Sequence, residues 1–390
     1  MLSSFVRVLS SAFIVLVLTA CDAPVASVAE TDGVPGSTRL AGLLGEDDRQ
    51  AFAYALEPRP FEFPRDHGPH PEFRNEWWYV TGNLEDDAGR RFGYELTIFR
   101  FSLSPERLEA DSGWRTDQIY IGHLAVSDPE GNRFLTDERY ARGALGLAGA
   151  EADPFRVWLG DWQMAGRNAS SEGPLNWRIE ARDSDGNFSV ELELESRKPA
   201  VLNGDRGLSQ KSAEAGNASY YYSLTRALTK GSLQIDEERF EVSGASWLDR
   251  EWSSSALSSE QTGWDWFALQ LDDDSELMFY QLRKTDGSVD PLSAGTLTAP
   301  DGTTRKLAAD EVSLSVLEYW DSPRGGRYPS RWRLQVPEES LDLEIVPVMP
   351  DQELSTTVRY WEGAVDVSGE RKGNALDGRG YVELTGYAAD

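Results

Sequence analysis

Cysteine and histidine are scarce in this chain of 390 residues. The single cysteine cannot form an internal disulfide, and three histidines leave little for a histidine-rich metal site. Basic residues are also few, with 38 Lys and Arg against 66 Asp and Glu, which gives a net charge of −28. A surface this negative repels nucleic acid phosphates, so the composition argues against nucleic acid as a partner.

Several common catalytic motifs are missing as well. The sequence has no nucleophile elbow, phosphate-binding loop, dinucleotide fingerprint or zinc motif. Aromatic residues, in contrast, are plentiful, with 13 Trp, 14 Tyr and 15 Phe. The hydrophobic fraction of 40% and the charged fraction of 27% are typical of a globular protein and argue against wholesale disorder. At about 150 residues per domain, the length predicts two or three domains.

The N-terminus has the pattern of a bacterial export signal. Arg7 precedes an apolar run at 12–18, which is too short to cross a bilayer and fits a signal peptide over 1–20. The run ends in Leu-Thr-Ala-Cys, which resembles a lipobox with Cys21 as the lipidated residue. The alternative is a secreted protein with an incidental cysteine. Asp22 resembles an inner-membrane retention signal, so we expect a periplasmic lipoprotein of the cell envelope, anchored in the inner membrane.

A polar segment rich in small residues follows the cysteine. Residues 21–57 are expected to form a tether that ends in one short helix over 47–56, stopped before Pro58.

From about residue 73 onward, alternation with a period of two replaces helical periodicity. In 188–195 apolar residues alternate with Ser and Glu, and 177–182 repeats the pattern after an Asp/Gly/Asn turn. Many short strands of this kind predict an all-β fold, either a sandwich or an up-and-down barrel. The strand at 92–101 is apolar on both faces, which fits either a strand beside a cavity or a strand between two domains.

A weak internal repeat supports two similar domains. Residues 77–100 contain an aromatic strand, an acidic turn and a second aromatic strand, and 264–283 contains the same succession. We therefore expect one β domain over 58–235 and another over 236–390.

Two histidines, His67 and His70, lie three residues apart in a loop broken by Pro and Gly. A metal site would need further ligands, and His123 is the one remaining histidine. The other interpretation is a loop whose histidines form hydrogen bonds that cap strand ends, and no metal is predicted.

Three carboxylates are candidates for acid–base chemistry. Asp265 shares a strand face with Phe267, so it is either paired with a cation, Arg250 being the candidate, or a general acid in a water-poor pocket. Asp249 and Glu251 share a face of their own strand, and they are either an acid and a base or simply solvated.

Several long stretches match a known signature. They are 63–71 (FPRDHGPHP), 76–82 (EWWYVTG), 123–125 (HLA), 198–205 (KPAVLNGD), 246–252 (SWLDREW), 263–267 (GWDWF) and 360–365 (YWEGAV). These stretches resemble the AttH/CrtC lipocalin-like family and extend over nearly the whole chain after the tether. The resemblance implies two tandem lipocalin-like antiparallel β-barrels.

The resemblance implies functions of different classes. Some members of the family are lipoproteins associated with ABC transporters, which suggests a hydrophobic small molecule or lipid as ligand and an ABC-transporter permease as partner. Others are carotenoid 1,2-hydratases, which need no cofactor. A third possibility is a docking protein without a small ligand. The residues expected to contact a ligand are Trp77, Trp78, Tyr79, His123, Tyr221, Trp252, Trp264 and Trp266.

In the hydratase interpretation, Asp265 or Asp249 protonates a terminal alkene. Trp264, Trp266 or Trp252 stabilises the resulting cation through its ring face, and His67 or Tyr79 orients the water that adds.

Overall fold

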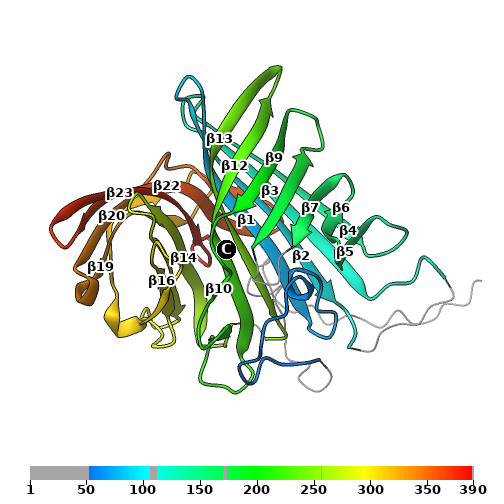
Figure 1. The fold of residues 1–390 in the computed structure, drawn as a ribbon, viewed down its shortest axis with the longest axis horizontal. Coiled ribbons are helices and arrows are strands. Elements are labelled where there is room, and N and C mark those ends of the chain that lie inside the picture. The colour runs from blue at the N-terminus through cyan, green and yellow to red at the C-terminus, as the bar shows by residue number, and fades with distance from the viewer. Residues whose placement is uncertain (1–51, 106–111, 170–173, 256, 389–390) are drawn as a thin grey trace, which may run out of the picture. The chain divides into compact units, whose positions relative to one another are not determined.

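The computed structural model describes residues 52–105, 112–169, 174–255 and 257–388. The predicted signal peptide, Cys21 and most of the tether lie outside these residues. Figure 1 shows two antiparallel β-sheets, the first drawn in blue to green and the second in green to red. Both sheets curl on themselves, so the all-β fold of two lipocalin-like barrels, one of them closer to a half-barrel, is confirmed.

The first sheet has the path β4-β3-β2-β1-β13-β12-β9-β8-β7-β6-β5, with β10 and β11 paired to β12. At one edge β5 and β6 approach β3 and β4 near the other edge. The strands are β1 (Asn75–Asp86), β2 (Arg91–Ser102), β3 (Gln118–Asp128), β4 (Arg133–Arg142), β5 (Ala148–Ala152), β6 (Phe155–Leu159), β7 (Trp162–Ala169), β8 (Leu175–Arg182), β9 (Phe188–Ser196), β10 (Val201–Leu202), β11 (Leu208–Gln210), β12 (Ala218–Ile235) and β13 (Glu238–Ser253).

The second sheet has the path β17-β16-β15-β14-β23-β22-β20-β19-β18, with β21 paired to β22. Its strands are β14 (Gln261–Leu271), β15 (Glu276–Lys284), β16 (Ala294–Thr298), β17 (Thr304–Ala308), β18 (Ser313–Asp321), β19 (Arg327–Val336), β20 (Leu341–Pro347), β21 (Glu353–Ser355), β22 (Arg359–Arg371) and β23 (Asn374–Leu384). Three short 3-10 helices complete the described residues: η1 (Arg65–His67), η2 (Ala309–Glu311) and η3 (Pro337–Glu339).

Two expectations about boundaries differ from the structure. The expected domain boundary between 235 and 236 falls in the turn between β12 and β13, which pair with each other inside the first sheet. The second sheet begins at β14, because β13 also pairs along its length with β1. Of the expected helix at 47–56, only 52–56 is described, and it is not helical. Within the described residues, no helix has the length and apolarity needed to cross a membrane.

Each sheet encloses a core made of its own side chains. In the first sheet these include Trp78 and Val80 of β1, and in the second Phe267 and Leu269 of β14. All four are fully buried. The side chains of both sheets therefore fill their interiors, and the opposite faces of the same strands are left for contact between the sheets.

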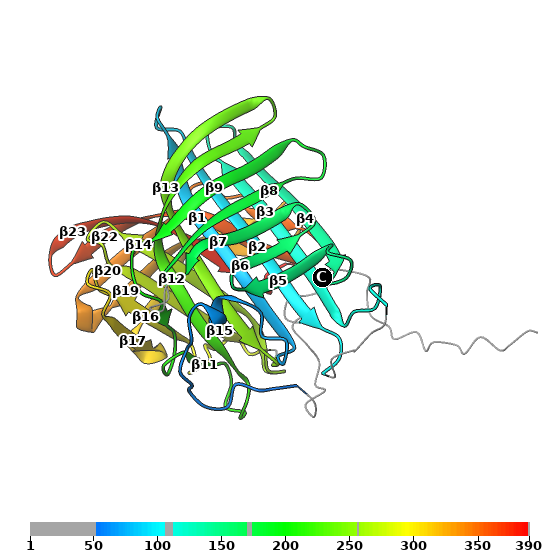
Figure 2. The same cartoon turned by 45° about the vertical axis from the view of Figure 1, so that its right-hand side comes forward.

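The sheets pack against each other through β1, β2, β12 and β13 on one side and β14, β15, β22 and β23 on the other. The turned view in Figure 2 shows the strands of the second sheet behind β1 and β13. At Gly93 of β2, an added Cβ would lie 2.6 Å from the Cβ of Ala364, so small residues permit this close approach. The strand predicted at 92–101 is β2, which lies between one barrel core and the other sheet.

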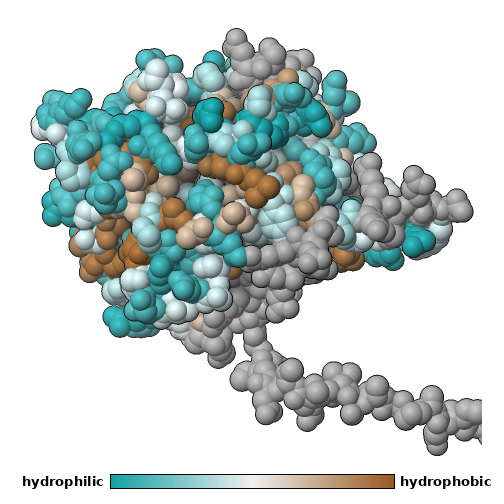
Figure 3. Space-filling model, turned by 90° about the horizontal axis from the view of Figure 1, so that it is seen from below, coloured by the Kyte–Doolittle hydropathy of each residue, from teal (hydrophilic) through white to brown (hydrophobic). Residues whose placement is uncertain are grey.

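The face of the molecule seen from below is mostly hydrophilic. Figure 3 shows one face on which hydrophilic side chains surround small hydrophobic patches. This distribution agrees with the net charge of −28.

Candidate functional site

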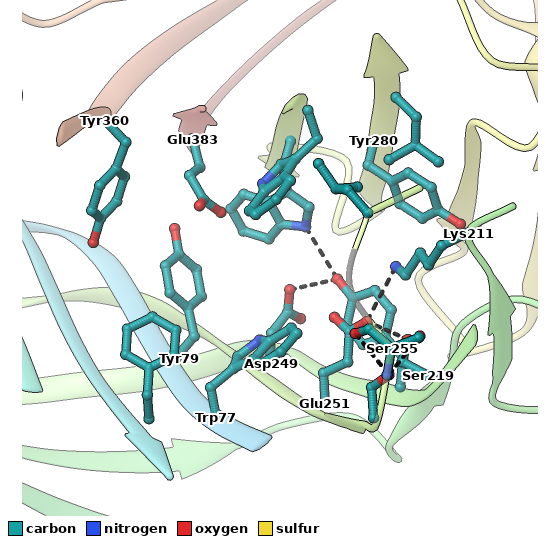
Figure 4. Close-up of a pocket in the computed structure, with 17 residues that line it drawn as sticks. Trp77, Tyr79, Lys211, Ser219, Asp249, Glu251, Ser255, Tyr280, Tyr360 and Glu383 are labelled. Atoms are coloured by element: carbon teal, nitrogen blue, oxygen red, sulfur yellow. Dashed lines mark hydrogen bonds and ion pairs between the residues drawn. The ribbon is translucent and has the colours of Figure 1, made fainter. Parts of the chain in front are cut away.

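A pocket lies between the two sheets. It holds about 940 Å³ of empty space, counting the part that opens to solvent. Figure 4 shows Tyr360 and Glu383 of the second sheet across the pocket from Trp77, Tyr79 and Asp249 of the first. The lining residues are Trp77, Tyr79, Phe99, Lys211, Ser219, Tyr221, Asp249, Glu251, Ser253, Ser255, Leu257, Trp264, Trp266, Tyr280, Leu282, Tyr360 and Glu383.

The alternation of side chains along β1 and β14 determines which aromatic residues line the pocket. Because successive side chains of a strand point to opposite faces, Trp77 and Tyr79 of β1 line the pocket while Trp78 between them lies in the first core. Trp264 and Trp266 of β14 line it in the same way from the second sheet. The rings of Tyr79 and Trp266 meet edge to face, with centroids 5.2 Å apart. The two aromatic strands of the sequence repeat thus face each other across one site.

Asp249 is the carboxylate at the base of the pocket, and its side chain is almost fully buried. It accepts hydrogen bonds from the hydroxyls of Tyr221 and Ser223, both 2.5 Å away, and from Nε1 of Trp247 at 2.7 Å. Burial raises the pKa of Asp249 to about 7, although these three hydrogen bonds favour the ionised form. At neutral pH this carboxyl therefore exchanges a proton readily.

Glu251 lies two residues further along the same strand face, as the sequence predicts, but it has a cation. Nζ of Lys211 lies 3.1 Å from Oε1 of Glu251, and the hydroxyl of Ser219 donates to the same oxygen. The ammonium also sits over the ring of Tyr280, 4.2 Å from its centroid. Lys211 is the one basic residue among those that line the pocket.

Further carboxyls face the gap between the sheets from the second side. Burial raises the pKa of Glu383 to about 8, against a hydrogen bond from Trp264 that lowers it. Behind it, burial and neighbouring carboxyls raise the pKa of Glu362 and Glu95 well above the usual range. Glu362 accepts a hydrogen bond from the hydroxyl of Tyr79. Glu383 is therefore mostly protonated near pH 7.

His123 is just outside the pocket and connects it to the surface. Its Nδ1 lies 2.6 Å from the hydroxyl of Tyr360, which lines the pocket, and its Nε2 lies 3.1 Å from Oε1 of Glu138. Burial alone raises the pKa of Glu138, but hydrogen bonds from His123, Tyr140 and Thr357 outweigh this and lower the pKa to about 2. An ionised Glu138 holds the proton of the imidazole on Nε2, which leaves Nδ1 to accept from Tyr360.

Asp265 lies outside the pocket. Its side chain is on the face of β14 that carries Phe267, as the sequence predicts, and it is fully buried. Its ion-pair partner is Arg283, with Nε 2.9 Å from Oδ1, and the hydroxyl of Tyr387 also donates to it. The pairing expected with Arg250 is wrong, because Arg250 belongs to the core of the first sheet.

Three other predicted residues also lie outside the pocket. Trp78 and Trp252 are fully buried in the first core, where the guanidinium of Arg250 lies over both rings. The ring of His70 stacks on Trp252 at a centroid distance of 3.8 Å. His67 is buried with its Nδ1 2.6 Å from the hydroxyl of Tyr222, and its carbonyl accepts from Nε1 of Trp78. Both histidines of the loop are thus buried, and each lies within hydrogen-bond distance of a side chain, His67 of Tyr222 and His70 of Asp66.

Several residues that line the pocket were not expected from the sequence. Lys211 lies in a polar loop that carries no motif, so nothing in the sequence marks it. Tyr360 opens one of the recognised stretches, which was a usable signal. Glu383 alternates with Val382 and Leu384 of the second core, a pattern that places it on the opposite face but not in a pocket.

The described residues contain no group of three or more His, Cys, Asp or Glu side chains arranged to hold a metal ion. The chemistry that the pocket offers is that of aromatic faces, titratable carboxyls and one paired ammonium.

Comparisons with known proteins place the chain in a family. A crystal structure of a protein from Nitrosomonas europaea described as AttH superposes with a TM-score of 0.74 at 36% identity, covering 86% of this chain and 100% of that one. Kievitone hydratase from Nectria haematococca superposes with a TM-score of 0.64 at 16% identity, covering 86% and 96%. No curated protein sequence matches the chain. The AttH-like family model matches residues 54–387, and the chain belongs to the AttH-like family.

Proposed function

We propose that the protein binds a hydrophobic small molecule in the pocket between its two sheets. The observation that carries this proposal is the contrast between the barrel interiors, which are filled by their own side chains, and the aromatic-lined space between the sheets. Pockets for small molecules are concave, mostly apolar, and carry a few placed polar groups. This pocket combines Trp77, Trp264 and Trp266 with carboxyls that hydrogen bonds hold in place.

Native mass spectrometry of the full-length protein after incubation with a hydrophobic extract of its own cells tests the proposal. We expect a retained small molecule, and we expect Trp266→Ala to lose it. Trp114→Ala is the matched control, because this tryptophan is 70% exposed and lies outside the pocket. Retention that is unchanged in Trp266→Ala, or absent from the wild type, would count against binding in this pocket.

Hydration of an alkene is a second candidate function, favoured by the two pocket carboxyls whose pKa values lie near 7 and 8. A protonated Asp249 or Glu383 would give its proton to one alkene carbon, and the other carbon would become a cation beside the indole faces. Water then adds to that carbon and returns a proton to the carboxylate. Kievitone hydratase has the same fold, which supports the comparison at the level of architecture only.

This second function has its own test. The extract that is not retained is analysed for products that have gained one water, with wild type, Asp249→Asn and Glu383→Gln. A hydrated product that is lost in either variant would support the enzyme. Hydration that persists in both variants would remove these two carboxyls from the acid role.

The location of the protein is proposed from the sequence alone. We propose that lipidation of Cys21 anchors it to the periplasmic face of the inner membrane, beside an ABC-transporter permease. In cell fractionation, Cys21→Ala is expected to move the protein from the membrane to the soluble fraction. Copurification of a permease with the anchored form would support the partner, and its absence would count against it.

A further inference from the structure

We propose that the ligand of the inter-sheet pocket is an amphipathic organic cation, a hydrophobic molecule that carries an ammonium or quaternary ammonium group. This inference rests on the proposed binding function and names the class of molecule that the pocket selects. It is argued from the charges that face the pocket, from the aromatic faces around them, and from an ammonium group that the protein already holds in the same way.

The pocket has more acidic groups than basic ones. Asp249, Glu251 and Glu383 line it, against Lys211 alone. Lys211 is already paired with Glu251. The hydrogen-bond donors to Asp249 are hydroxyls and an indole, which carry no positive charge. Asp249 and Glu383 therefore face the pocket without a basic partner among the residues that line it.

Aromatic side chains surround these two carboxyls. Trp264 and Trp266 come from one side of the pocket, and Trp77 and Tyr79 from the other. The face of an indole or phenol ring attracts a cation, by about 0.5 to 2 kcal/mol depending on how far the cation is desolvated. A flat apolar ligand would profit from these rings alone, but it would gain nothing from the two carboxyls, which a cation would attract in their ionised form.

Lys211 shows how the pocket accommodates an ammonium group. Its Nζ lies over Tyr280 at 4.2 Å and 5.3 Å from the centroid of Tyr221, while Glu251 supplies the carboxylate at 3.1 Å. Around Asp249 and Glu383 the pocket also has aromatic faces beside a carboxyl, but the protein supplies no cation there. The ammonium group of a ligand would take the position that Nζ of Lys211 has beside Glu251.

The buried acids behind the pocket strengthen the same preference. Oε2 of Glu362 has no hydrogen-bond partner among the described residues, and Thr97 alone supplies a hydrogen bond that favours the ionised form of Glu95. Burial raises the pKa of both groups, Glu383 raises it further, and Glu95 also raises the pKa of Glu362. A positive charge placed near Glu383 lowers the cost of ionising any of them, and no anionic ligand would have this effect.

Binding of a cation should therefore release protons. The groups that face Asp249 are Glu251 and Tyr221, and the charge of Lys211 also acts on it. Those that face Glu383 are Trp264 and the carboxyls of Asp249, Glu251, Glu95 and Glu362. A ligand cation favours the ionised form of both carboxyls, so its affinity rises with pH until they are ionised without it, at about pH 7 to 8. His123 contacts the hydroxyl of Tyr360 at the pocket wall.

Isothermal titration calorimetry of the full-length protein with decyltrimethylammonium, decanol and decanoate tests the inference. The three probes share one alkyl chain, and the quaternary ammonium does not titrate. We expect the cation to bind about tenfold or more tighter than decanol at pH 8, with decanoate weakest. We also expect its affinity to fall on going to pH 6 while that of decanol stays constant, and proton release to appear in buffers of different ionisation enthalpy.

Variants assign the effect to the pocket. Glu383→Gln and Asp249→Asn are expected to reduce the ratio of the affinity for decyltrimethylammonium to the affinity for decanol. Glu370→Gln, an exposed residue at the far end of β22, is the matched control and should bind all three probes like the wild type. Circular dichroism confirms that each variant is folded.

The outcomes separate this inference from the proposed function. Equal affinity for decyltrimethylammonium and decanol, or tighter binding of decanoate, would overturn the cation inference and leave hydrophobic binding in place. A cation preference that survives in both pocket variants would also overturn it. If none of the probes binds and the cell extract yields no retained molecule, the binding function itself fails.

Discussion

Two groups of buried carboxylates lie on opposite faces of β1 and β13, and they differ in how their charge is compensated. On the face toward the first core, Glu76 forms ion pairs with both Arg100 and Arg250, and the backbone N–H of His70 donates to it at 3.0 Å. On the face toward the second sheet, Asp249 is held by neutral donors. Adjacent residues of one strand, Asp249 and Arg250, thus belong to two different sites.

The pKa values of Glu76 and Asp249 depend on whether a cation lies beside the carboxylate. Burial by itself raises the pKa of Glu76, but the two guanidinium groups outweigh it and hold the pKa well below its usual range. Burial raises the pKa of Asp249 to about 7, because no cation compensates it. A compensated carboxylate is fixed in one ionisation state and serves the fold. An uncompensated one can change its state, which is what binding a cation or donating a proton requires.

The largest expected effect comes from breaking the compensated group. Glu76→Gln leaves two buried guanidinium groups without their carboxylate and should lower the free energy of unfolding by about 3 to 5 kcal/mol. Urea denaturation at neutral pH measures this change. The exposed Glu370→Gln should change stability by no more than about 0.5 kcal/mol. A loss below about 1 kcal/mol for Glu76→Gln would mean that the network contributes little to the fold.

The second prediction concerns pH, and the two groups should respond with opposite sign. The folded-state pKa of Asp249 is raised, so the folded protein holds this proton when the unfolded chain has lost it, and stability falls as pH rises toward 7. Below pH 6 this amounts to at most about 1.4 kcal/mol per pH unit, and it falls to about half of that at pH 7. In denaturation curves measured between pH 5 and 7, Asp249→Asn should remove this share of the slope, while the shares of Glu383, Glu362 and Glu95, whose pKa values are also raised, remain.

Glu76 provides the comparison for this slope. Its folded-state pKa is lowered, so its contribution is present above about pH 4.5 and is lost as the pH falls further. Equal slopes for wild type and Asp249→Asn between pH 5 and 7 would show that Asp249 is ionised in the folded protein.

Asp265 gives a third, smaller effect that sharpens the comparison. It is buried and paired with Arg283, but burial outweighs this pairing and raises its pKa, and it lies outside the pocket. Asp265→Asn should lower stability by about 1 to 3 kcal/mol and leave decyltrimethylammonium binding unchanged. Calorimetric titration of the folded variant measures the second part, and a lost affinity would bring Asp265 back as a site residue.

The smallest expected effect is that of the pocket's own cation. Lys211→Met removes a positive charge that repels a ligand cation and frees Glu251, so decyltrimethylammonium should bind a few-fold tighter. The same titration at pH 8 measures this change. Weaker binding in the variant would mean that Lys211 holds the pocket open and that its charge is of little importance.

Much of the fold could be predicted because strand alternation is local. Alternation assigned Asp249 and Glu251 to one face and Asp265 to the face of Phe267, and the structure has them so. Alternation together with the internal repeat of 77–100 and 264–283 predicted two similar β-sheets, and their aromatic strands are β1 and β14. It could not tell which face of each strand becomes a barrel core and which meets the other sheet.

Partners that are distant in sequence could not be predicted for the same reason. Arg250 reaches Glu76, 174 residues away, although Asp265 is much nearer in the chain. Glu383 reaches the pocket only because β23 pairs with β14 and faces the first sheet. Such pairings depend on how sheets curl and pack, and the period of a strand carries no information about them.

The sequence by itself determined the all-β fold, the family and the side of each strand on which a residue lies, because backbone geometry fixes the direction of successive side chains. Tertiary structure alone decided where the site is. Packing fills both barrel interiors and leaves a space between the sheets, and this same packing separates Glu76, which is paired with two guanidinium groups, from Asp249, which has no cation beside it. The energy of a buried carboxylate depends on the charges within a few ångströms of it, and the folded chain places those charges from remote parts of the sequence.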